Sequence, residues 1–567
     1  MHLNDAIRLS EIPYTAFHNE QAAAMAAESY ARVKGELAVC VVTSGPGVSN
    51  LATGVAGAFL DSAPVLYISG QAKSLEMVTE EMKPGVRQVG TFELPGVEIL
   101  RGITKSARIL QLQDNVQEVI KNLVDTALHG RPGPVYLEVP MDVQGAPCEE
   151  SKKPLVLSMY ASENSESASF ANAFIEALKT SKRPLVLAGH GVRTGNGRDL
   201  LLKLINELNI PIVTTQLAKD LIPYSDSHFV GHPGLRGDRA GNMAVFESDL
   251  LLCIGTSLQQ QTVGYEPADF ALNSKKFVVD FEQSVSKKKV PFAIERVVNC
   301  EVSTVLQDLI RSYPSHSGEL EDFDAWIKLN VDRKRDLAVF KEPHDLSTPE
   351  INMYEFANVL SEASFPGDTI LTDAGLCFYI IGQGFLTKEG QRYIASGGLG
   401  AMGYALPASI GAVAAGCQRV ICITGDGSAQ LNVQELATLA STKGRAIIFV
   451  LNNGGYASIR NTQRSFFSPS HIGASESSGV LMPNWEKIAE AYSLNFMRIE
   501  NRSDLKNGID QALSTTTPLL VEVICQYTQG LMPSVSSFKL ADGRLKSNPL
   551  HVMSPSLATS ENPVELN

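Results

Sequence analysis

The segment VICITGDG (residues 420–427) and the segment IIFVLNNGG (residues 447–455) decide the fold of this chain. Each begins with an apolar run typical of a buried strand. Residues 432–443 lie between them and place Val433 and Leu436 at helical spacing. The pattern predicts a strand, a helix and a parallel strand. Both polar endings then emerge at the carboxyl edge of one sheet, where open α/β sheets bind ligands.

The two polar endings carry oxygen ligands suited to a hard cation. The carboxylate of Asp426, the amide oxygen of Asn453 and a backbone carbonyl at Gly455 are donors of the kind that Mg²⁺ prefers, with phosphate oxygens and water completing its octahedron. Each half alone also suits an ordinary turn, because Asp-Gly and Asn-Asn-Gly-Gly are common in loops. Their occurrence together, at the ends of neighbouring strands, favours a site for a cation and a diphosphate.

A second glycine-rich segment, GLGAMG at residues 398–403, fits the G-x-G-x-x-G pattern of dinucleotide-binding folds. However, the strand predicted before it, at residues 392–395, is short and polar. The acid that would bind a ribose, Asp426, also lies between two glycines of the cation loop. We therefore reject a Rossmann dinucleotide site at this segment.

Composition excludes several classes of protein. The chain has 567 residues, 44% of them hydrophobic, which predicts a globular protein of several domains. Its net charge of −13, without a Lys/Arg cluster, argues against nucleic acid or an anionic membrane surface as a partner. No apolar stretch is long enough to span a bilayer, and the first residues do not resemble a signal peptide. The eight cysteines are scattered singly, which is typical of reduced thiols, so we expect a cytoplasmic enzyme without a zinc site.

Strand runs alternate with helical stretches along most of the chain, which predicts an α/β fold with parallel sheets and crossover helices. We expect three doubly wound domains, at residues 1–150, 168–312 and 350–535, followed by a tail of turns at residues 536–567. A stretch rich in Ser, Glu and Lys links the first two domains.

Four motifs occur in a specific order. The first domain holds HNEQAAAMAAE at residues 18–28 and TSGPGVSNL at residues 43–51, and the third holds SGGLGAMG at residues 396–403 before the GDG and NN segments. In these motifs the chain resembles thiamine-diphosphate-dependent decarboxylases and carboligases of the acetolactate synthase type, and the resemblance covers nearly the whole chain. It implies a pyrimidine-binding first domain, a central domain and a diphosphate-binding third domain. It also implies that a 2-keto acid, such as pyruvate, loses carbon dioxide and that its two-carbon unit passes to a carbonyl acceptor.

The resemblance gives each matched residue a role. Glu20 matches the carboxylate beside N1′ of the aminopyrimidine and is the predicted catalytic residue, although alone it would be an ordinary acid in the first turn of a helix. Met402 matches the bulky residue that bends the cofactor, with core packing as the alternative. The Gly400 carbonyl would accept a hydrogen bond from the 4′-amino group. The other predicted ligands are Gly425, Gly427, Ser428 and Tyr456 for the cofactor, and Asp426, Asn453 and Gly455 for Mg²⁺.

The predicted acceptor site departs from the family's pattern. Acetolactate synthases carry an arginine that helps to hold the carboxylate of the second keto acid, and Gln261 stands in its place. They also carry a tryptophan after the Asn-Asn pair, where this chain has Thr462. We therefore expect an uncharged, hydroxyl-rich acceptor such as a keto-deoxy nucleotide sugar. The alternatives are an ordinary acetolactate synthase, which joins two 2-keto acids, a simple decarboxylase, which usually has a His-His pair that this chain lacks, and a non-catalytic cofactor-binding scaffold.

FAD is a further candidate cofactor, because some members of the family bind it in the central domain. The glycine turns at residues 189–191 and 231–234 and the acid Asp280 match such members, whereas Ser257 replaces one of their arginines. The arginines that we expect near a flavin diphosphate are Arg193, Arg236 and Arg239.

The resemblance also implies a homodimer or homotetramer. Glu20 and Asp426 fall in different domains, and the family places the cofactor between such domains of two subunits. Relatives have about one strand–helix pair before the segment that matches residues 2–5. A missing core strand would destabilise the first domain, so we expect the native start to lie upstream of Met1.

Overall fold

A computed structural model describes residues 2–148, 165–282, 284–313, 320–442, 444–467, 472–540 and 542–557. Residues 149–164 and 558–567, in the predicted linker and tail, lie outside this description. Contacts group the chain into two units. Unit 1 comprises residues 1–161, 367–378 and 394–527, and unit 2 comprises residues 162–366, 379–393 and 528–567.

The first sheet of unit 1 has four parallel strands in the order β1-β2-β4-β3. Helix α2 begins at Glu20 because the Asn19 side chain caps it by accepting a hydrogen bond from the Gln21 amide. It packs against α3, and its alanines are buried there. The elements of this part are α1 (His2–Leu9), α2 (Glu20–Lys34), β1 (Ala38–Val42), α3 (Pro46–Leu60), β2 (Val65–Gln71), α4 (Gly96–Leu100), β3 (Ser106–Ile109), α5 (Val116–Leu128), β4 (Val135–Pro140) and α6 (Met141–Gln144).

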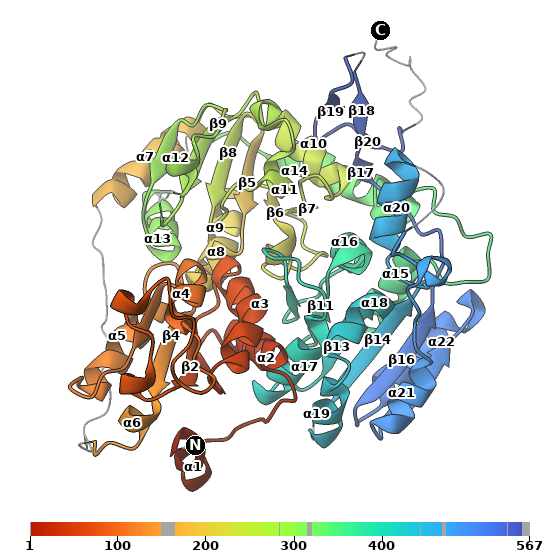
Figure 1. The fold of residues 1–567 in the computed structure, drawn as a ribbon. Helices are drawn as coiled ribbons and strands as arrows, with labels where there is room; N and C mark the ends of the chain where they lie inside the picture. The colour runs from red at the N-terminus through yellow and green to blue at the C-terminus, as the bar shows by residue number, and fades with distance from the viewer. Residues whose placement is uncertain are drawn as a thin grey trace. The chain divides into compact units, whose positions relative to one another are not determined.

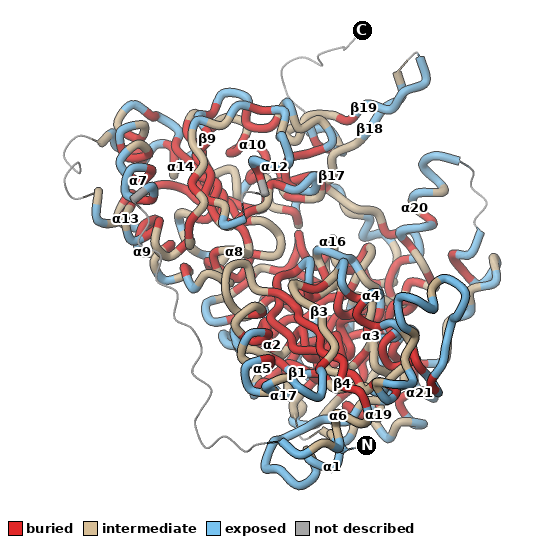
Figure 2. The backbone as a smooth tube through the Cα atoms, turned by 60° about the vertical axis from the view of Figure 1, so that its left-hand side comes forward, coloured by how far each residue is buried: buried red, intermediate tan, exposed pale blue. Residues whose placement is uncertain are grey.

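The second sheet of unit 1 has six strands in the order β12-β11-β13-β14-β16-β15, and Figure 1 shows its central strands side by side. The pairs from β11 to β15 are parallel. The central strands are buried along nearly their whole length, which explains their continuous Ile, Val and Leu runs. Figure 2 shows buried residues in the interior and exposed residues mainly in loops and outer helices. The strands are β11 (Thr369–Thr372), β12 (Arg392–Ala395), β13 (Val420–Gly425), β14 (Ala446–Asn452), β15 (Asn495–Ile499) and β16 (Leu519–Ile524).

The helices around this second sheet begin with α16 (Gly375–Gly384), whose residues fall in both units. The others are α17 (Ala405–Ala414), α18 (Asp426–Ala429), α19 (Glu435–Ser441), α20 (Ala457–Phe466), α21 (Trp485–Ala491) and α22 (Leu505–Ser514).

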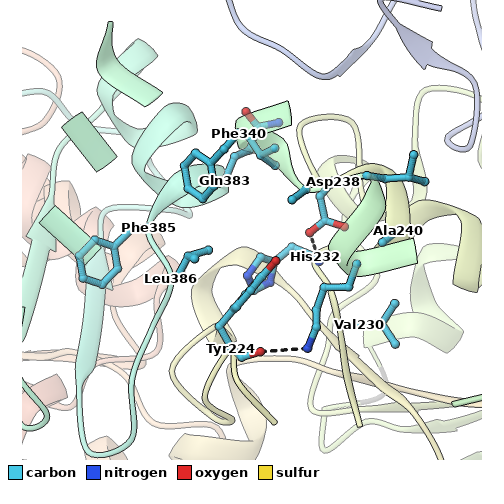
Figure 3. A pocket seen from close by; sticks show the side chains of 13 residues that line it. Tyr224, Val230, His232, Asp238, Ala240, Phe340, Gln383, Phe385 and Leu386 are labelled. Atoms are coloured by element: carbon cyan, nitrogen blue, oxygen red, sulfur yellow. Dashed lines mark hydrogen bonds between the residues drawn. The ribbon is translucent and has the colours of Figure 1, made fainter. Parts of the chain in front are cut away.

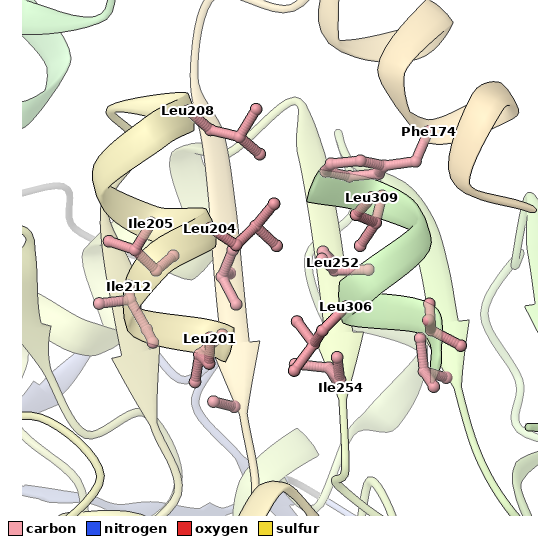
Figure 4. Packing of buried hydrophobic residues seen from close by; sticks show 14 of the residues in the cluster. Phe174, Leu201, Leu204, Ile205, Leu208, Ile212, Leu252, Ile254, Leu306 and Leu309 are labelled. Atoms are coloured by element: carbon pink, nitrogen blue, oxygen red, sulfur yellow. The ribbon is translucent and has the colours of Figure 1, made fainter. Parts of the chain in front are cut away.

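Unit 2 contains a six-stranded parallel sheet in the order β10-β9-β8-β5-β6-β7. Leucines of α9 and α13, among them Leu204, Leu208 and Leu306, cover the strand residues Leu252 and Ile254 (Figure 4). The strands are β5 (Pro184–Ala188), β6 (Ile212–Thr214), β7 (Phe229–Gly231), β8 (Leu250–Ile254), β9 (Lys275–Val279) and β10 (Arg296–Val298).

The helices of unit 2 are α7 (Ser165–Leu178), α8 (Gly191–Thr194), α9 (Arg198–Leu208), α10 (Arg239–Glu247), α11 (Gln260–Val263), α12 (Ser284–Lys288), α13 (Val302–Ser312), α14 (Asp324–Asp336) and α15 (Met353–Ala363). The predicted tail of turns contains short strands instead of turns alone. A hairpin joins β18 (Ser537–Lys539) to β19 (Leu545–Ser547), and β20 (Met553–Ser554) pairs with β17 (Ser534–Val535).

The predicted α/β fold with parallel sheets is confirmed, whereas the predicted domain boundaries stay predictions. The helix predicted at residues 432–443 is present as α19 (Glu435–Ser441), but a short helix before it, α18, was not predicted. Helical backbone begins at Asp426, immediately after β13, and continues through a short turn into α19. Gly425 caps it in an extended conformation, so the GDG motif forms the first helical turn. Residues 426–430 carry no apolar periodicity, and the sequence pattern could not show this start.

Candidate functional site

Asp426 joins the two polar loops at the carboxyl edge of the second sheet of unit 1. Its Oδ1 accepts a hydrogen bond from the Gly427 amide at 2.8 Å, and its Oδ2 accepts one from the Gly455 amide at 2.8 Å. The side chain is buried, and burial raises the pKa of this carboxyl group to about 6, against the opposing effect of the two amides. Within the described residues no cationic side chain forms an ion pair with it. The charge of Arg460 also lowers the pKa of Asp426 without an ion pair. A buried carboxylate that keeps free lone pairs and has no ion-pair partner fits a divalent cation.

Arg460 holds the loop that carries Asn453, and sequence analysis did not identify it. Its guanidinium is fully buried and donates to the backbone oxygens of Asn453 at 2.9 Å and Gly454 at 3.2 Å. It also lies 4.0 Å from the centre of the Tyr527 ring. Asn453 itself is buried beside it, and its amide oxygen keeps a second lone pair for a metal ion. The sequence signal was only a lone arginine in the helix after the loop.

Two of the predicted glycines are required by close approach. Gly455 has a φ of 121°, and a Cβ there would lie 2.5 Å from the Ala474 carbonyl oxygen. A Cβ on Gly427 would lie 2.3 Å from the ring of Tyr456, so this predicted cofactor ligand packs directly on the GDG turn. A Cβ on Gly425 would meet no atom within 4 Å, which leaves open space beside the loop. This arrangement fits a diphosphate that approaches the backbone closely.

Ser428 links the GDG turn to the second glycine-rich loop, residues 396–403. Its hydroxyl accepts a hydrogen bond from the Gly403 amide at 2.9 Å and also forms a hydrogen bond with the carboxyl group of Asp373. Asp373 is buried and also accepts hydrogen bonds from the Thr424 hydroxyl at 2.9 Å and the Tyr404 amide at 3.2 Å. Asp373 was not predicted as a site residue, because the residues next to it in the sequence do not indicate these distant partners.

The second glycine-rich loop presents Gly400 and Met402 to the surface. The Gly400 amide donates to the Ser396 carbonyl at 2.9 Å, and its φ of 69° makes a tight turn. The side chain of Met402 is 39% exposed, so core packing, the alternative for this methionine, is wrong. Helix α17 begins only at Ala405, after the loop, which agrees with the rejection of a Rossmann site at this segment.

Glu20 lies in the first turn of α2 and is half-buried. Its Oε2 accepts a hydrogen bond from the Asn50 amide group at 2.9 Å, so the two motifs of the predicted pyrimidine-binding domain meet. The amides of His18 and Asn19 donate to Oε1 of Glu435 in α19, at 3.1 and 3.0 Å, and this fixes the start of α2. Within the described residues no hydrogen bond or ion pair joins Glu20 to Asp426.

The two predicted acceptor residues are both exposed. Gln261 lies in α11 of unit 2, where its backbone oxygen accepts a hydrogen bond from the Leu235 amide at 2.9 Å. Thr462 lies in α20 of unit 1, and its hydroxyl donates to the Ser458 carbonyl of the same helix at 3.0 Å. They belong to different units, and their contact with an acceptor stays a prediction.

The arginines expected near a flavin have other partners. Arg239 forms a buried ion pair with Glu342, at 2.5 and 2.9 Å, and Arg193 pairs with Asp220 at 3.2 Å. Arg236 lies 4.4 Å from the centre of the Tyr379 ring. These contacts use the cations that were expected for a flavin diphosphate, so the residues present do not fit that role.

A pocket in unit 2 is lined by polar groups that are also satisfied by protein neighbours (Figure 3). Asp238 accepts from the His232 amide at 2.7 Å, and Lys334 donates to the Tyr224 carbonyl at 2.9 Å. Burial raises the pKa of Asp238 to about 6, and it lowers the pKa of Lys334 to about 8 and that of His232 to about 3. We assign this pocket to the packing of unit 2.

The described residues contain no helix that is both long and apolar enough to cross a membrane. In the same residues, no group of three or more His, Cys, Asp and Glu side chains is arranged to hold a metal ion. A magnesium site built from one carboxylate, one amide and one carbonyl does not require such a group.

Comparisons with known proteins agree with this geometry. The sequence matches thiamine pyrophosphate enzymes in three parts: the N-terminal TPP-binding domain over residues 1–90, the central domain over residues 171–309 and the C-terminal TPP-binding domain over residues 373–523. It is 30% identical to a probable acetolactate synthase large subunit of Methanococcus aeolicus, over 91% of this chain and 86% of that protein. It is 29% identical to the acetolactate synthase large subunit of Lactococcus lactis subsp. lactis (94% and 89%) and 30% identical to the chloroplastic acetolactate synthase of Arabidopsis thaliana (96% and 82%).

Proposed function

Because this chain belongs to the thiamine-diphosphate-dependent enzymes of the acetolactate synthase family, we propose that it is a carboligase that decarboxylates pyruvate and joins the two-carbon unit to a second 2-keto acid. The structural observation that carries the proposal is Asp426, a buried carboxylate without a cationic partner among the described residues, held between the amides of Gly427 and Gly455. Retention of this arrangement together with Glu20 argues against a non-catalytic scaffold.

The proposal assigns each residue a task toward the cofactor. Bound thiamine diphosphate supplies an electron sink for the electrons released when carbon dioxide leaves a 2-keto acid. Glu20 would share a proton with N1′ of the aminopyrimidine, and the Gly400 carbonyl would accept a hydrogen bond from the 4′-amino group. Met402, exposed at the loop surface, would support the bent cofactor. Other groups would hold the diphosphate and Mg²⁺: Gly425, Gly427, Ser428 and Tyr456 for the diphosphate, and Asp426, Asn453 and Gly455 for the metal.

The comparisons favour a second keto acid as acceptor over a nucleotide sugar. The relatives named above are acetolactate synthases, and they match this chain over most of their length. Gln261 and Thr462 suggested a sugar, but both are exposed, and no contact within the described residues supports a sugar-binding role. We therefore adopt the joining of two keto acids, and expect another residue to replace the missing arginine at the acceptor carboxylate.

The direct test is an NMR time course of labelled pyruvate with enzyme, thiamine diphosphate and Mg²⁺. Steady formation of acetolactate from pyruvate alone would support the proposal. Slow consumption of pyruvate alone, followed by a new carbon–carbon bond when a keto-deoxy nucleotide sugar is added, would refute it in favour of the sugar acceptor. Release of free acetaldehyde would indicate a simple decarboxylase.

Mg²⁺ is part of the proposal, and FAD is not. The oxygen ligands of the Asp426 site fit Mg²⁺, whereas Arg193 and Arg239 already have protein carboxylates as partners. The flavin can be sought by the absorbance of the purified enzyme near the visible flavin bands.

We also propose domain boundaries at residues 1–150, 168–312 and 350–535, with a tail at 536–567. A cytoplasmic location stays a prediction.

We further propose that the site is completed by a second copy of the chain. Arg32, near one end of α2, contacts the Ala395 carbonyl just before the loop that carries Gly400. Glu20 lies at the other end of the same helix, about 18 Å away at 1.5 Å per residue. The ground for this proposal is the family resemblance, in which the cofactor lies between such domains of two subunits, so that Glu20 would serve the cofactor of a partner copy.

Mixing two inactive variants, Glu20→Gln and Asp426→Asn, tests the shared site. Random dimers built from them would regain about a quarter of wild-type activity if each site uses residues of both copies. No recovery, with mixed dimers shown by mass, would refute the shared site.

A further inference from the structure

A buried ionic cluster of unit 1 lies outside the predicted cofactor ligands. Arg32 Nη1 donates to Glu28 Oε1 at 2.8 Å and approaches Asp61 Oδ2 at 3.5 Å. It also donates to the Ala395 carbonyl at 2.9 Å. The three charged side chains are each only 2% exposed. Burying this many charges is costly unless their remaining hydrogen-bonding groups have defined partners.

Both carboxyl oxygens of Asp61 accept hydrogen bonds from the cofactor loop. Asp61 Oδ1 accepts from the Gly398 amide at 2.8 Å, and Oδ2 accepts from the Gly397 amide at 3.2 Å. A Cβ on Gly398 would lie 2.7 Å from Asp61 Oδ1 and 2.7 Å from the Leu60 side chain. The loop therefore sits directly on Asp61, and only glycine permits this approach.

We propose that Asp61, fixed by Arg32, is a positioning residue that holds the loop of residues 396–403 in the conformation that binds thiamine diphosphate. The inference rests on the proposed function of Gly400 and Met402. We do not place Asp61 in contact with cofactor or substrate. It acts through the amides of Gly397 and Gly398 near the start of the loop.

The position of Asp61 in the fold explains why a carboxylate is needed. It caps the end of α3, the helix whose first turns contain Asn50, the partner of Glu20. Two amides on consecutive residues converge on two oxygens, and a carboxylate can accept both while it also faces Arg32. Burial raises the pKa of both Asp61 and Glu28, and the guanidinium of Arg32 opposes this effect.

The test compares Asp61→Asn with a matched control, Asp368→Asn. Asp368 is also buried and paired with an arginine, since Arg419 Nε donates to its Oδ1 at 2.7 Å. It lies next to the amino end of β11, at the opposite edge of the sheet from the cofactor loops. Both variants break a buried ion pair, but only Asp61→Asn disturbs the loop.

Thiamine diphosphate binding with Mg²⁺, measured by calorimetric titration of the full-length chain, is the first readout. We expect the Kd to rise about tenfold or more in Asp61→Asn, because charge-assisted hydrogen bonds to the loop are lost, and to change less than about twofold in Asp368→Asn. When Asp61→Asn is saturated with thiamine diphosphate, it should regain most of its kcat/KM for pyruvate, because the bound cofactor can still order the loop. Thermal unfolding without cofactor shows the structural cost of each variant separately.

A second variant keeps the inference testable if Asp61→Asn does not fold. Gly398→Ala leaves all three charges in place and displaces the loop sterically, so it should weaken cofactor binding to a similar extent. An equal Kd for the Asp61 variant, the Gly398 variant and the control would overturn the positioning role. Wild-type protein that does not bind thiamine diphosphate would overturn the proposed function and this inference together.

Discussion

Replacement of Asp426 by Asn should have opposite effects on the free protein and on the cofactor complex. The carboxyl group is buried without a cationic partner among the described residues, and its pKa is raised by burial to about 6 from an ordinary value of 3.8. Its ionisation therefore destabilises the folded protein when no metal is bound. On the proposed function, a bound divalent cation would reverse this effect, because it would stabilise the ionised carboxylate.

The pKa gives the size and the sign of the effect. One pKa unit corresponds to about 1.36 kcal/mol, so full ionisation of Asp426 costs the metal-free protein about 3 kcal/mol. Because the folded pKa lies above the unfolded one, this cost is absent below about pH 4, grows as the pH rises, and is complete above about pH 6. Asn does not ionise and escapes the cost. Asn also offers one acceptor in place of two to the amides of Gly427 and Gly455, which costs about 1–3 kcal/mol at every pH.

The assay is thermal unfolding of wild type and Asp426→Asn in EDTA, without cofactor, between about pH 4.5 and about pH 7.5. About 1 kcal/mol of the cost is already present at about pH 4.5, so the window covers about 2 kcal/mol of change. The difference between the two midpoints should therefore move in favour of the variant by about 4–8 °C as the pH rises, at about 2–4 °C per kcal/mol for a domain of 150–250 residues. The exposed carboxylate of Asp510 supplies the control, since Asp510→Asn should show no such change. Thiamine diphosphate and Mg²⁺ at about a hundredfold their Kd should then stabilise only the wild type, by about 2.7 kcal/mol.

Two results would refute this reasoning. A midpoint difference that is constant over the whole pH range would show that Asp426 ionises normally in the folded protein. Equal stabilisation of wild type and variant by Mg²⁺ and cofactor would show that Asp426 is not a metal ligand.

Four further substitutions test the remaining roles. Glu20→Gln should lower pyruvate turnover about 100-fold or more while cofactor binding persists, and unchanged turnover would remove Glu20 from the mechanism. Met402→Ala should leave the unfolding midpoint of the cofactor-free protein nearly unchanged, because the side chain is 39% exposed, and should lower kcat; a large loss of stability would return Met402 to the core. Gly427→Ala should lower the unfolding midpoint of the cofactor-free protein, because its Cβ would lie 2.3 Å from the Tyr456 ring, and Tyr456→Ala in the same chain should restore part of that midpoint; no recovery would show that the clash is not with Tyr456. Gln261→Arg should lower the KM for the acceptor keto acid in a two-substrate assay, and an unchanged KM would place Gln261 outside the acceptor site.

The local sequence pattern was sufficient to predict β13 and β14, the strands that carry the candidate site. Continuous apolar runs predicted β13 and β14, because strands of a parallel sheet are buried on both faces and lose the polar alternation of an exposed sheet. The order of the two strands around a helix then placed Asp426 and Asn453 at one edge. The structure joins their loops there through the hydrogen bond from the Gly455 amide to Asp426.

Local pattern was less reliable where residues lack periodicity. The predicted helix contains α19, whereas the short helix α18 that begins at Asp426 was not predicted, because its small and polar residues give no repeating signal. The same limit applies to the short strands β18, β19 and β20 in the predicted tail, which are too short to show alternation.

Tertiary structure alone decided which buried charges support the site. Asp61 and Asp373 bind amides of the loop and helix that follow β12, and Arg460 holds the Asn453 loop, yet each is an isolated charged residue in the sequence. Asp61 and Gly398 lie far apart along the chain and meet only in the tertiary structure of unit 1. A sequence records spacing along one element, whereas the free energy of a buried charge depends on partners from several elements. The motifs therefore predicted the residues of the candidate site, and they did not predict the groups that hold those residues in place.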